Sequence, residues 1–284
     1  GGRVAGARHA FRPCAARGRW RGEHRDRPGA GASRRSDGRF VRRDHDLVAR
    51  ETRTPRTAAG EPALAARFGR ALRAWFRKNG RDLPWRRTRD PYRVLVSEAM
   101  LQQTQVSRVV DYYARFLARF PTLDRLAAAR PAQVRESWQG LGYYARARNL
   151  HALSRRDDGE LPSEPGELRK LPGVGAYTAG AVASFAFEKR AVLVDTNVAR
   201  VIRRAFAPRA DFKSGRGSKR IWAIAEALLP KTGAQTWQHN QAIMELGAIV
   251  CTARTAYCNR CPVQALCVTG RRTTAAVGWK SRKY

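Results

Sequence analysis

The chain has 284 residues, of which 43% are apolar, and its 56 Lys and Arg against 23 Asp and Glu give a formal net charge of +33. Such an excess of positive charge is typical of proteins that bind a polyanion, so nucleic acid is the expected partner. No apolar run is long enough to cross a membrane, and the five Cys do not have the spacing of a secreted disulfide framework.

Residues 1–60 are rich in Arg, Gly and Ala and lack helical or strand periodicity, so we expect a disordered tail. A first helix is predicted over residues 62–78, where apolar side chains recur on one face before Asn79-Gly80 ends it. Leu83-Pro84-Trp85-Arg86 follows as a loop, in which Trp85 is either a core residue or part of a pocket.

A second helix is expected over residues 92–101, and it carries Glu98 among apolar neighbours. A carboxyl group in such surroundings is costly to ionise, so burial would raise the pKa of Glu98 and suit it to general acid catalysis. The alternative is a Glu on the solvated face of an amphipathic helix. The polar run Gln102–Gln105 then separates this helix from the next.

Further helices are predicted over residues 106–120, 123–129 and 134–138, before the loop Gln139-Gly140-Leu141-Gly142-Tyr143-Tyr144. Glycines let the backbone approach a ligand, and an aromatic side chain there can wedge between bases. We expect Tyr144 to pack on the core, whereas a wedge role for Tyr143 is implied only by the family resemblance that the motifs below complete.

The segment Leu171-Pro172-Gly173-Val174-Gly175 predicts a tight turn between two helices, because Pro restricts φ and the glycines permit positive φ. Backbone N–H groups at the start of the second helix, predicted over residues 176–187, would bind a phosphate. Asp195 stands before a helix predicted over residues 198–206. Asp195 is either a helix N-cap alone, or a carboxylate held at a helix start that faces the ligand bound by the hairpin of the two helices around Gly173.

A basic loop over residues 209–219 and helices over residues 221–229 and 237–250 are expected next, the last of them carrying Gln241. Four Cys then fall within seventeen residues, with the spacing C-x6-C-x2-C-x5-C. They are Cys251, Cys258, Cys261 and Cys267. Thiols this close are usually metal ligands, although the spacing alone does not decide between zinc and an iron–sulfur cluster. Two disulfides or four buried thiols are the alternative without a metal.

Several of these motifs, in the same order from about Leu83 to Cys267, resemble the helix-hairpin-helix DNA glycosylase superfamily, the group of endonuclease III and the MutY-type adenine glycosylases. The most specific are the run Ser-Glu-Ala-Met-Leu-Gln-Gln-Thr-Gln-Val from Ser97 and the four-cysteine spacing. The resemblance implies an all-α fold in which the active-site cleft lies between two domains. The implied helical barrel domain spans residues 92–200, the discontinuous iron–sulfur cluster domain spans 61–91 and 201–267, and a basic tail covers 268–284.

The resemblance also implies a monofunctional DNA glycosylase that flips out and removes adenine mispaired with guanine or 8-oxoguanine in double-stranded DNA. Glu98 would protonate the adenine, and Asp195 would stabilise the sugar cation or add to it covalently. Tyr177 and Asn197 complete the expected catalytic group. The expected DNA-binding residues are Trp85, Arg86, Gln102, Gln103, Tyr143, Leu171, Gly173, Val174, Gly175 and Gln241. The four cysteines are expected to hold a [4Fe–4S] cluster.

Tyr177 distinguishes two subgroups of this superfamily. Endonuclease III type lyases for oxidised pyrimidines need a Lys Schiff base at this position, and here it is Tyr. A non-catalytic DNA-binding protein of the same fold is a second alternative, against which the presence of both Glu98 and Asp195 argues. We expect a monomer in a bacterial cytoplasm, associated with the nucleoid through DNA. Since few residues follow Cys267, we also expect the second domain that reads 8-oxoguanine to be missing, and the preference for the oxidised partner to be weakened.

Overall fold

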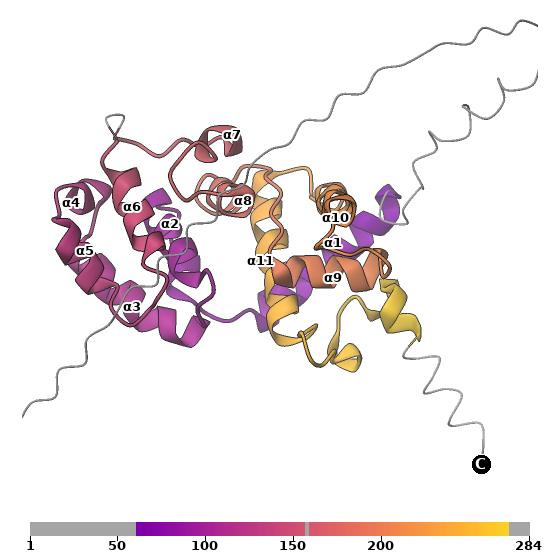
Figure 1. The fold of residues 1–284 in the computed structure, drawn as a ribbon. Helices are drawn as coiled ribbons and strands as arrows, with labels where there is room; N and C mark the ends of the chain where they lie inside the picture. Colours follow the sequence, from indigo (N-terminus) through magenta and orange to yellow (C-terminus); the bar gives the residue numbers. More distant parts are fainter. Residues whose placement is uncertain (1–60, 157–158, 273–284) are drawn as a thin grey trace, which may run out of the picture. The chain divides into compact units, whose positions relative to one another are not determined.

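The computed structural model describes residues 61–156 and 159–272, and this part of the chain is helical (Figure 1). Its only strand-like pairing is a single antiparallel bridge between Cys251 and Ala256. None of the helices described is both long and apolar enough to span a bilayer. The tail predicted over residues 1–60 and most of the tail predicted over residues 268–284 lie outside the described residues.

The described chain begins with α1 (Pro62–Asn79), the 3-10 helix η3 (Pro84–Arg86), α2 (Pro91–Leu101), α3 (Val106–Arg119), α4 (Leu123–Ala127), α5 (Pro131–Ser137) and α6 (Ala145–Ser154). It continues with α7 (Pro165–Leu168), α8 (Ala176–Phe185), α9 (Thr196–Phe206), α10 (Gly215–Ala227) and α11 (Gly233–Ile249), followed by the 3-10 helices η4 (Cys258–Arg260) and η5 (Gln264–Leu266). The all-α prediction is therefore confirmed.

Helix α2 is the most deeply buried of the first seven elements. The Asp90 side chain accepts hydrogen bonds from the backbone N–H groups of Tyr92 and Arg93, and Pro91 occupies the first helical position. Both features favour a helix start at this point. Because α2 packs against α3, α6 and α8, nearly all of its side chains are enclosed. Glu98 therefore cannot lie on a solvated face.

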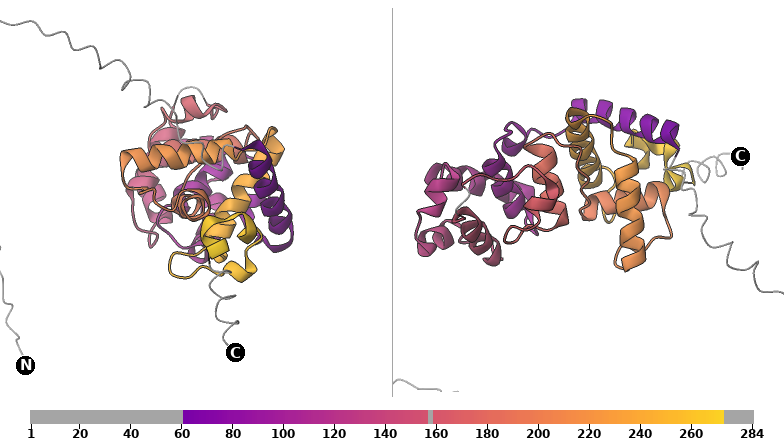
Figure 2. Two further views of the ribbon diagram at one scale, coloured as in Figure 1. Left: turned by 90° about the vertical axis from the view of Figure 1, so that its right-hand side faces the viewer. Right: turned by 90° about the horizontal axis from the view of Figure 1, so that it is seen from above.

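Helix α11 has the corresponding place among the later elements. It packs against α1, α8 and α9, and Figure 2 shows the indigo α1 beside the orange α11. Helices α1 and α11 are the first and the last α-helices of the described chain, so their contact joins segments that are far apart in sequence. Side chains on α11 thus meet the segment between α1 and α2.

Two predicted helix starts are wrong by four or more residues. Helix α10 begins at Gly215 and not at residue 221, and α11 begins at Gly233 and not at residue 237. In each case a hydroxyl group caps the helix: Ser214 Oγ accepts from the N–H of Gly217, and Thr232 Oγ1 accepts from the N–H of Gln235. The glycines had suggested loops, but the caps stabilise the first turns.

Candidate active site

A cavity of about 590 Å³ lies where η3, α2, α8, α9 and α11 converge. Nine of the residues predicted to be catalytic or to bind DNA line it. They are Trp85, Arg86, Glu98, Gln102, Gln103, Tyr177, Asp195, Asn197 and Gln241. A cavity of this size suits a small planar ligand. Trp85 is buried and also contacts Tyr113 edge to face, with ring centroids 5.5 Å apart, so both interpretations of Trp85 hold.

Glu98 is the buried acid of this cavity, with only 3% of its surface exposed. Burial raises the pKa of its carboxyl group to about 7, and the Asp195 carboxylate adds to this, while Tyr177 and Arg86 partly counter it. The Oε2 atom of Glu98 is buried without a hydrogen-bond partner among the described residues. A carboxyl group in this state is half protonated near neutral pH, so it can donate a proton to a ligand in the cavity.

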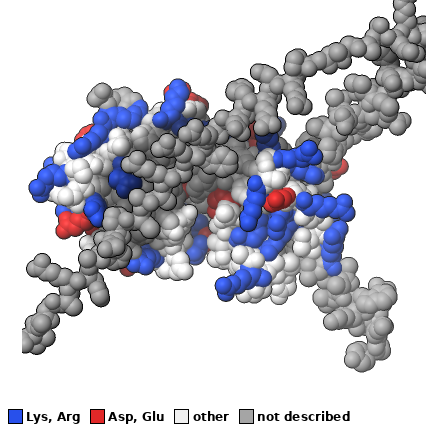
Figure 3. Space-filling view, viewed as in Figure 1, with Lys and Arg blue, Asp and Glu red and all other residues white. Residues whose placement is uncertain are grey.

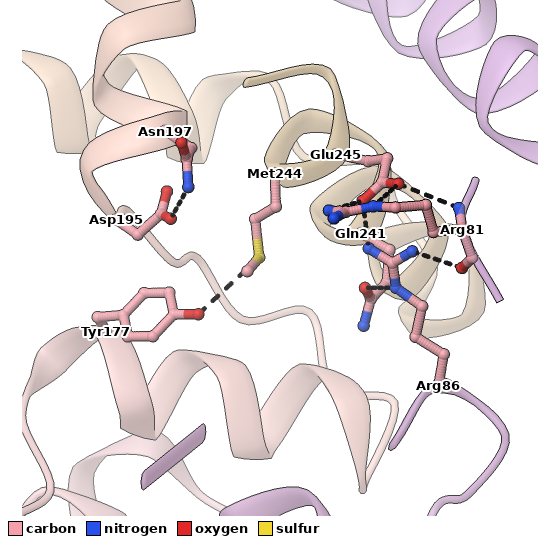
Figure 4. Close-up of polar contacts among 8 residues, drawn as sticks. All are labelled: Arg81, Arg86, Tyr177, Asp195, Asn197, Gln241, Met244 and Glu245. Atoms are coloured by element: carbon pink, nitrogen blue, oxygen red, sulfur yellow. Dashed lines mark hydrogen bonds and ion pairs between the residues drawn. The ribbon is translucent and has the colours of Figure 1, made fainter. Parts of the chain in front are cut away.

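Tyr177 lines the same cavity and lies near both carboxyl groups. It belongs to the first turn of α8, and its hydroxyl group donates to Met244 Sδ at 4.0 Å (Figure 4). Burial raises the pKa of Tyr177 well above its usual value, and the charges of Glu98 and Asp195 add to the effect. The hydroxyl group therefore stays protonated, and its proximity to Glu98 lowers the pKa of that carboxyl.

Asp195 is the N-cap of α9, as one of its two predicted interpretations requires, and it also lines the cavity. Its Oδ1 accepts from the N–H of Val198 at 2.7 Å, and its Oδ2 accepts from Asn197 Nδ2 at 2.8 Å (Figure 4). Burial raises the pKa of Asp195, while these two hydrogen bonds and the charge of Arg200 oppose the shift. Arg200 in turn donates to Asn197 Oδ1 at 2.6 Å and to the Cys251 carbonyl at 2.8 Å. The carboxylate is thus held in one orientation.

A second network fixes the wall formed by η3 and α11. Arg86 Nε donates to Gln241 Oε1 at 2.8 Å, and Arg86 Nη2 donates to Glu245 Oε2 at 2.8 Å (Figure 4). Arg81 pairs with both oxygens of Glu245, at 2.7 and 2.9 Å. Burial alone would raise the pKa of Glu245, but the hydrogen bonds from Arg81 and Arg86 lower it to about 2. Glu245 therefore stays ionised and holds Arg86 in place.

The hairpin residues lie outside this cavity. Gly173 has φ +74°, as the predicted turn requires, and a Cβ at this position would lie 2.6 Å from Asn149 Nδ2. Gly175 is the N-cap residue of α8. The side chains of Leu171 and Val174 are buried, so only the backbone of these two residues is placed to meet a ligand. The hairpin residues are therefore not part of the cavity lining, and the idea that Asp195 faces the ligand of the hairpin stays a prediction.

Gln103 and Tyr143 project from the fold with unusual backbone conformations. Tyr143 is 61% exposed, and Gln103 is also exposed. The φ angles of Gln103, +58°, and of Tyr143, +48°, are in the left-handed region. Tyr144 is half-buried and packs against the core, as expected. Lys and Arg predominate over Asp and Glu on the face drawn in Figure 3. Exposed polar and aromatic tips on a basic surface suit contact with DNA.

The four cysteines of the predicted cluster line a second, small cavity of about 30 Å³, and none of them is in a disulfide. In the described part of the chain, no three His, Cys, Asp or Glu side chains are grouped closely enough to hold a metal ion as they stand. Two N–H donors point at sulfur atoms, Arg204 Nη1 to Cys251 Sγ at 3.2 Å and the N–H of Gly270 to Cys267 Sγ at 3.3 Å. Such donors stabilise thiolate ligands, so the donor set fits a cluster.

Comparison with known proteins agrees with this geometry. The family model of the HhH-GPD superfamily of base excision DNA repair proteins matches residues 96–237, half of the chain. This chain belongs to the HhH-GPD superfamily. The matched region contains the second half of α2, the hairpin and both carboxylates.

Relatives within the HhH-GPD superfamily are named adenine DNA glycosylase. The Rattus norvegicus protein is 45% identical over 218 residues, which cover 72% of this chain and 42% of that protein. The Mycolicibacterium smegmatis protein is 44% identical over 197 residues, which cover 68% of this chain and 66% of that protein. The chain thus spans about two fifths of the length of the rat relative and about two thirds of that of the mycobacterial one.

Solved HhH-GPD neighbours share the fold over most of the described residues. A thermostable thymine-DNA glycosylase has a TM-score of 0.67 and 29% identity, and the match covers 74% of this chain and 98% of that one. A non-covalent complex of endonuclease III with DNA has a TM-score of 0.62 and 25% identity, and covers 75% and 98%. The helical architecture is therefore that of the superfamily.

Sequence reasoning missed three residues that line this cavity, Arg81, Met244 and Glu245, and it also missed the buried Arg146 on α6. Glu245 lies one helical turn after Gln241 and among apolar residues, which is the same signal that indicated Glu98. Arg81 had no comparable signal, because its partner Glu245 is 164 residues away. Arg146 follows Tyr143 and Tyr144 in the sequence, and no local pattern indicates its role. Its guanidinium group donates hydrogen bonds to several backbone carbonyls.

Proposed function

We propose that this chain is an adenine-specific DNA glycosylase that hydrolyses the N-glycosidic bond of adenine mispaired with guanine or 8-oxoguanine. The observation that carries the proposal is the pair of carboxyl groups in one cavity, Glu98 with a pKa of about 7 and Asp195 fixed as an N-cap. The similarity to relatives named adenine DNA glycosylase supports the choice of base. Double-stranded DNA is the substrate, and the protein acts as a monomer.

The cavity is deep within the fold, so the adenine has to leave the base stack to reach it. Glu98 then donates its proton to the adenine ring, and the electrons of the bond between the sugar and the base move onto the departing adenine. Positive charge develops on the deoxyribose, where the Asp195 carboxylate stabilises it. Water then adds to the sugar carbon and releases a proton. The products are an abasic site and free adenine. General acid catalysis typically contributes roughly 10²–10⁴ in rate.

The direct test is excision from labelled duplexes that carry adenine opposite guanine, adenine opposite 8-oxoguanine, or an oxidised pyrimidine. We expect strand breaks at the adenine only after alkali treatment, because Tyr177 cannot form a Schiff base with the sugar. Borohydride should trap little covalent complex. Excision of oxidised pyrimidines with nicking in the absence of alkali would instead favour an endonuclease III type lyase, and binding without excision of any base would favour a non-catalytic protein.

The pH dependence of excision follows from the two carboxyl groups. Glu98 must be protonated to act as an acid, and its pKa is about 7. The single-turnover rate constant should therefore fall about tenfold for each pH unit above roughly 7. Asp195 must be ionised, and because its pKa is raised, the rate should also fall on the acidic side. A rate that stays constant from pH 6 to pH 9 would contradict the assignment of Glu98.

We propose further that Cys251, Cys258, Cys261 and Cys267 hold a [4Fe–4S] cluster. Bound there, the cluster would tie the segment after α11 into one rigid loop, and the neighbouring Arg254 and Arg260 would add positive charge for DNA phosphates.

Purified protein should be brown and contain about four iron atoms per chain. Cys258→Ser should lose iron and weaken duplex binding, since the loop would lose its anchor. Cys14→Ser, which removes the cysteine outside the cluster motif, is the matched control and should keep its iron. Colourless protein that excises adenine and holds one zinc ion would overturn the cluster.

A further inference from the structure

Arg146, on α6, is a charged side chain that the proposed chemistry does not use. It is only 9% exposed, and within the described residues no carboxylate forms an ion pair with it. A buried charge is costly unless hydrogen bonds satisfy it. Its guanidinium group must therefore find acceptors in the surrounding backbone.

The first group of acceptors belongs to the end of α2. Arg146 Nη1 donates to the carbonyls of Ala99 at 2.9 Å and Met100 at 2.7 Å, and also to that of Gln102. Carbonyls in the last turn of a helix have no helical partner, and a cation there also complements the helix dipole. Arg146 Nη2 adds a bond to Thr104 Oγ1 at 3.2 Å. These contacts hold the segment on both sides of Gln103.

The second group of acceptors belongs to the glycine-rich loop. Arg146 Nη2 donates to the carbonyls of Leu141 at 3.3 Å and Gly142 at 3.1 Å, and Nε donates to that of Tyr143 at 3.4 Å. The guanidinium carbon also lies 5.4 Å from the centroid of the Tyr143 ring. A single planar group thus joins two segments that are about 40 residues apart in sequence.

Both joined segments contain a strained residue at the position that projects from the surface. Among the described residues, three non-glycine residues have positive φ, and two of them are Gln103 and Tyr143. Such a conformation is unfavourable for a residue with a side chain and persists only where the surroundings determine it. The hydrogen bonds of Arg146 surround both positions, so they are suited to hold the two conformations together.

We propose that Arg146 is a positioning residue that locks Gln103 and Tyr143 at a fixed separation, so that both side chains enter the DNA stack together. This proposal rests on the proposed function. Arg146 itself touches neither the substrate nor the reacting atoms. It acts through the two loops, and its planar fork cannot be replaced by a point charge.

The test is a mutant cycle built on Arg146→Lys, a change that keeps the charge but cannot reach both loops. Single-turnover excision at saturating protein should fall by about tenfold or more, because small misplacements of binding groups are costly to the rate. Affinity for a fully matched duplex should change by less than about twofold, since it is mostly electrostatic. The matched control is Arg148→Lys, the same change at an exposed position of the same helix, and it should excise at the parental rate.

The decisive comparison repeats Arg146→Lys in a protein that already carries Gln103→Ala and Tyr143→Ala. If Arg146 acts through those residues, the further loss should be less than about twofold, because coupled positions are not additive. A full additional tenfold loss would show a general structural role and overturn the proposal. Should Arg146→Lys yield no folded protein, Thr104→Val, which removes a single acceptor, takes its place with a smaller expected loss of the same non-additive kind.

Hydrogen exchange of the free protein separates this proposal from the proposed function. Arg146→Lys should speed exchange in both segments, residues 101–104 and 140–144, and leave α11 at its parental rate. Faster exchange in only one segment would overturn the lock. If the parental protein excised no adenine, the proposed function would fail, while the exchange result would still decide whether Arg146 joins the two loops.

Discussion

Glu98→Gln should bind mispaired duplex with parental affinity and lose adenine excision by a factor of about 10³ or more. The amide keeps the size of the buried side chain but has no proton to give to the base, so the acid contribution disappears. The measurement is single-turnover excision beside duplex affinity, at one stated salt concentration because binding by so basic a chain is salt-dependent. Excision at the parental rate would mean that another group supplies the proton.

The same variant should change the pH dependence of stability, which gives a readout independent of DNA. The pKa of Glu98 rises from 4.5 to about 7 on folding, so the folded state binds the proton more tightly than the unfolded state. The contribution of Glu98 to the free energy of unfolding is then fully present below pH 4.5 and is lost as the pH rises through about 7. A shift of this size corresponds to roughly 3 kcal/mol. Relative to Glu98→Gln, the parental protein should lose thermal stability across this window. Glu136→Gln, the same change at an exposed position, should track the parent.

Asp195→Asn should keep the fold and lose most of the catalysis, by about 10²–10³ in the excision rate constant. Asn and Asp are comparable N-caps, so the hydrogen bond to the N–H of Val198 can persist while the negative charge is removed. The expected stability cost is about 1 kcal/mol, from the altered contact with Asn197.

Asp90→Asn is the matched control, because Asp90 caps α2 in the same way and lies outside the cavity. It should excise adenine at the parental rate. If Asp195→Asn also remained active, the carboxylate at Asp195 would be a structural cap and the sugar cation would be stabilised elsewhere.

Local patterns predicted those parts of the site that are encoded within one turn or one helix. The apolar neighbours of Glu98 left both burial and a solvated face open, and the family resemblance favoured burial, whereas the cap at Asp195 followed from its place before a periodic helix. The role expected of Tyr143 came from the family resemblance, and its exposed side chain is consistent with that role. Tyr144 packs against the core, as the local pattern favoured.

Features that depend on tertiary contact were not predictable in this way. The pairing of Arg81 and Arg86 with Glu245 joins η3 to α11, and the contacts of Arg146 join α6 to the end of α2. No periodicity or spacing indicates which charged residue among so many arginines will be buried. The starts of α10 and α11 were misplaced for a simpler reason, since glycine in a first helical turn resembles a loop until its cap is recognised.

The fixed amide of Gln241 has a consequence for which bases fit the cavity. An arginine only donates, so the hydrogen bond from Arg86 Nε requires the oxygen of Gln241 to face it and leaves the NH₂ group free to turn towards the cavity. A protonated Glu98 also donates. The cavity therefore offers donors from two sides, which suits a purine whose ring nitrogens N1, N3 and N7 all accept. Guanine carries a proton at N1 and an amino group at C2, so along that edge it would place donors against donors and leave hydrogen bonds unmet without any steric barrier.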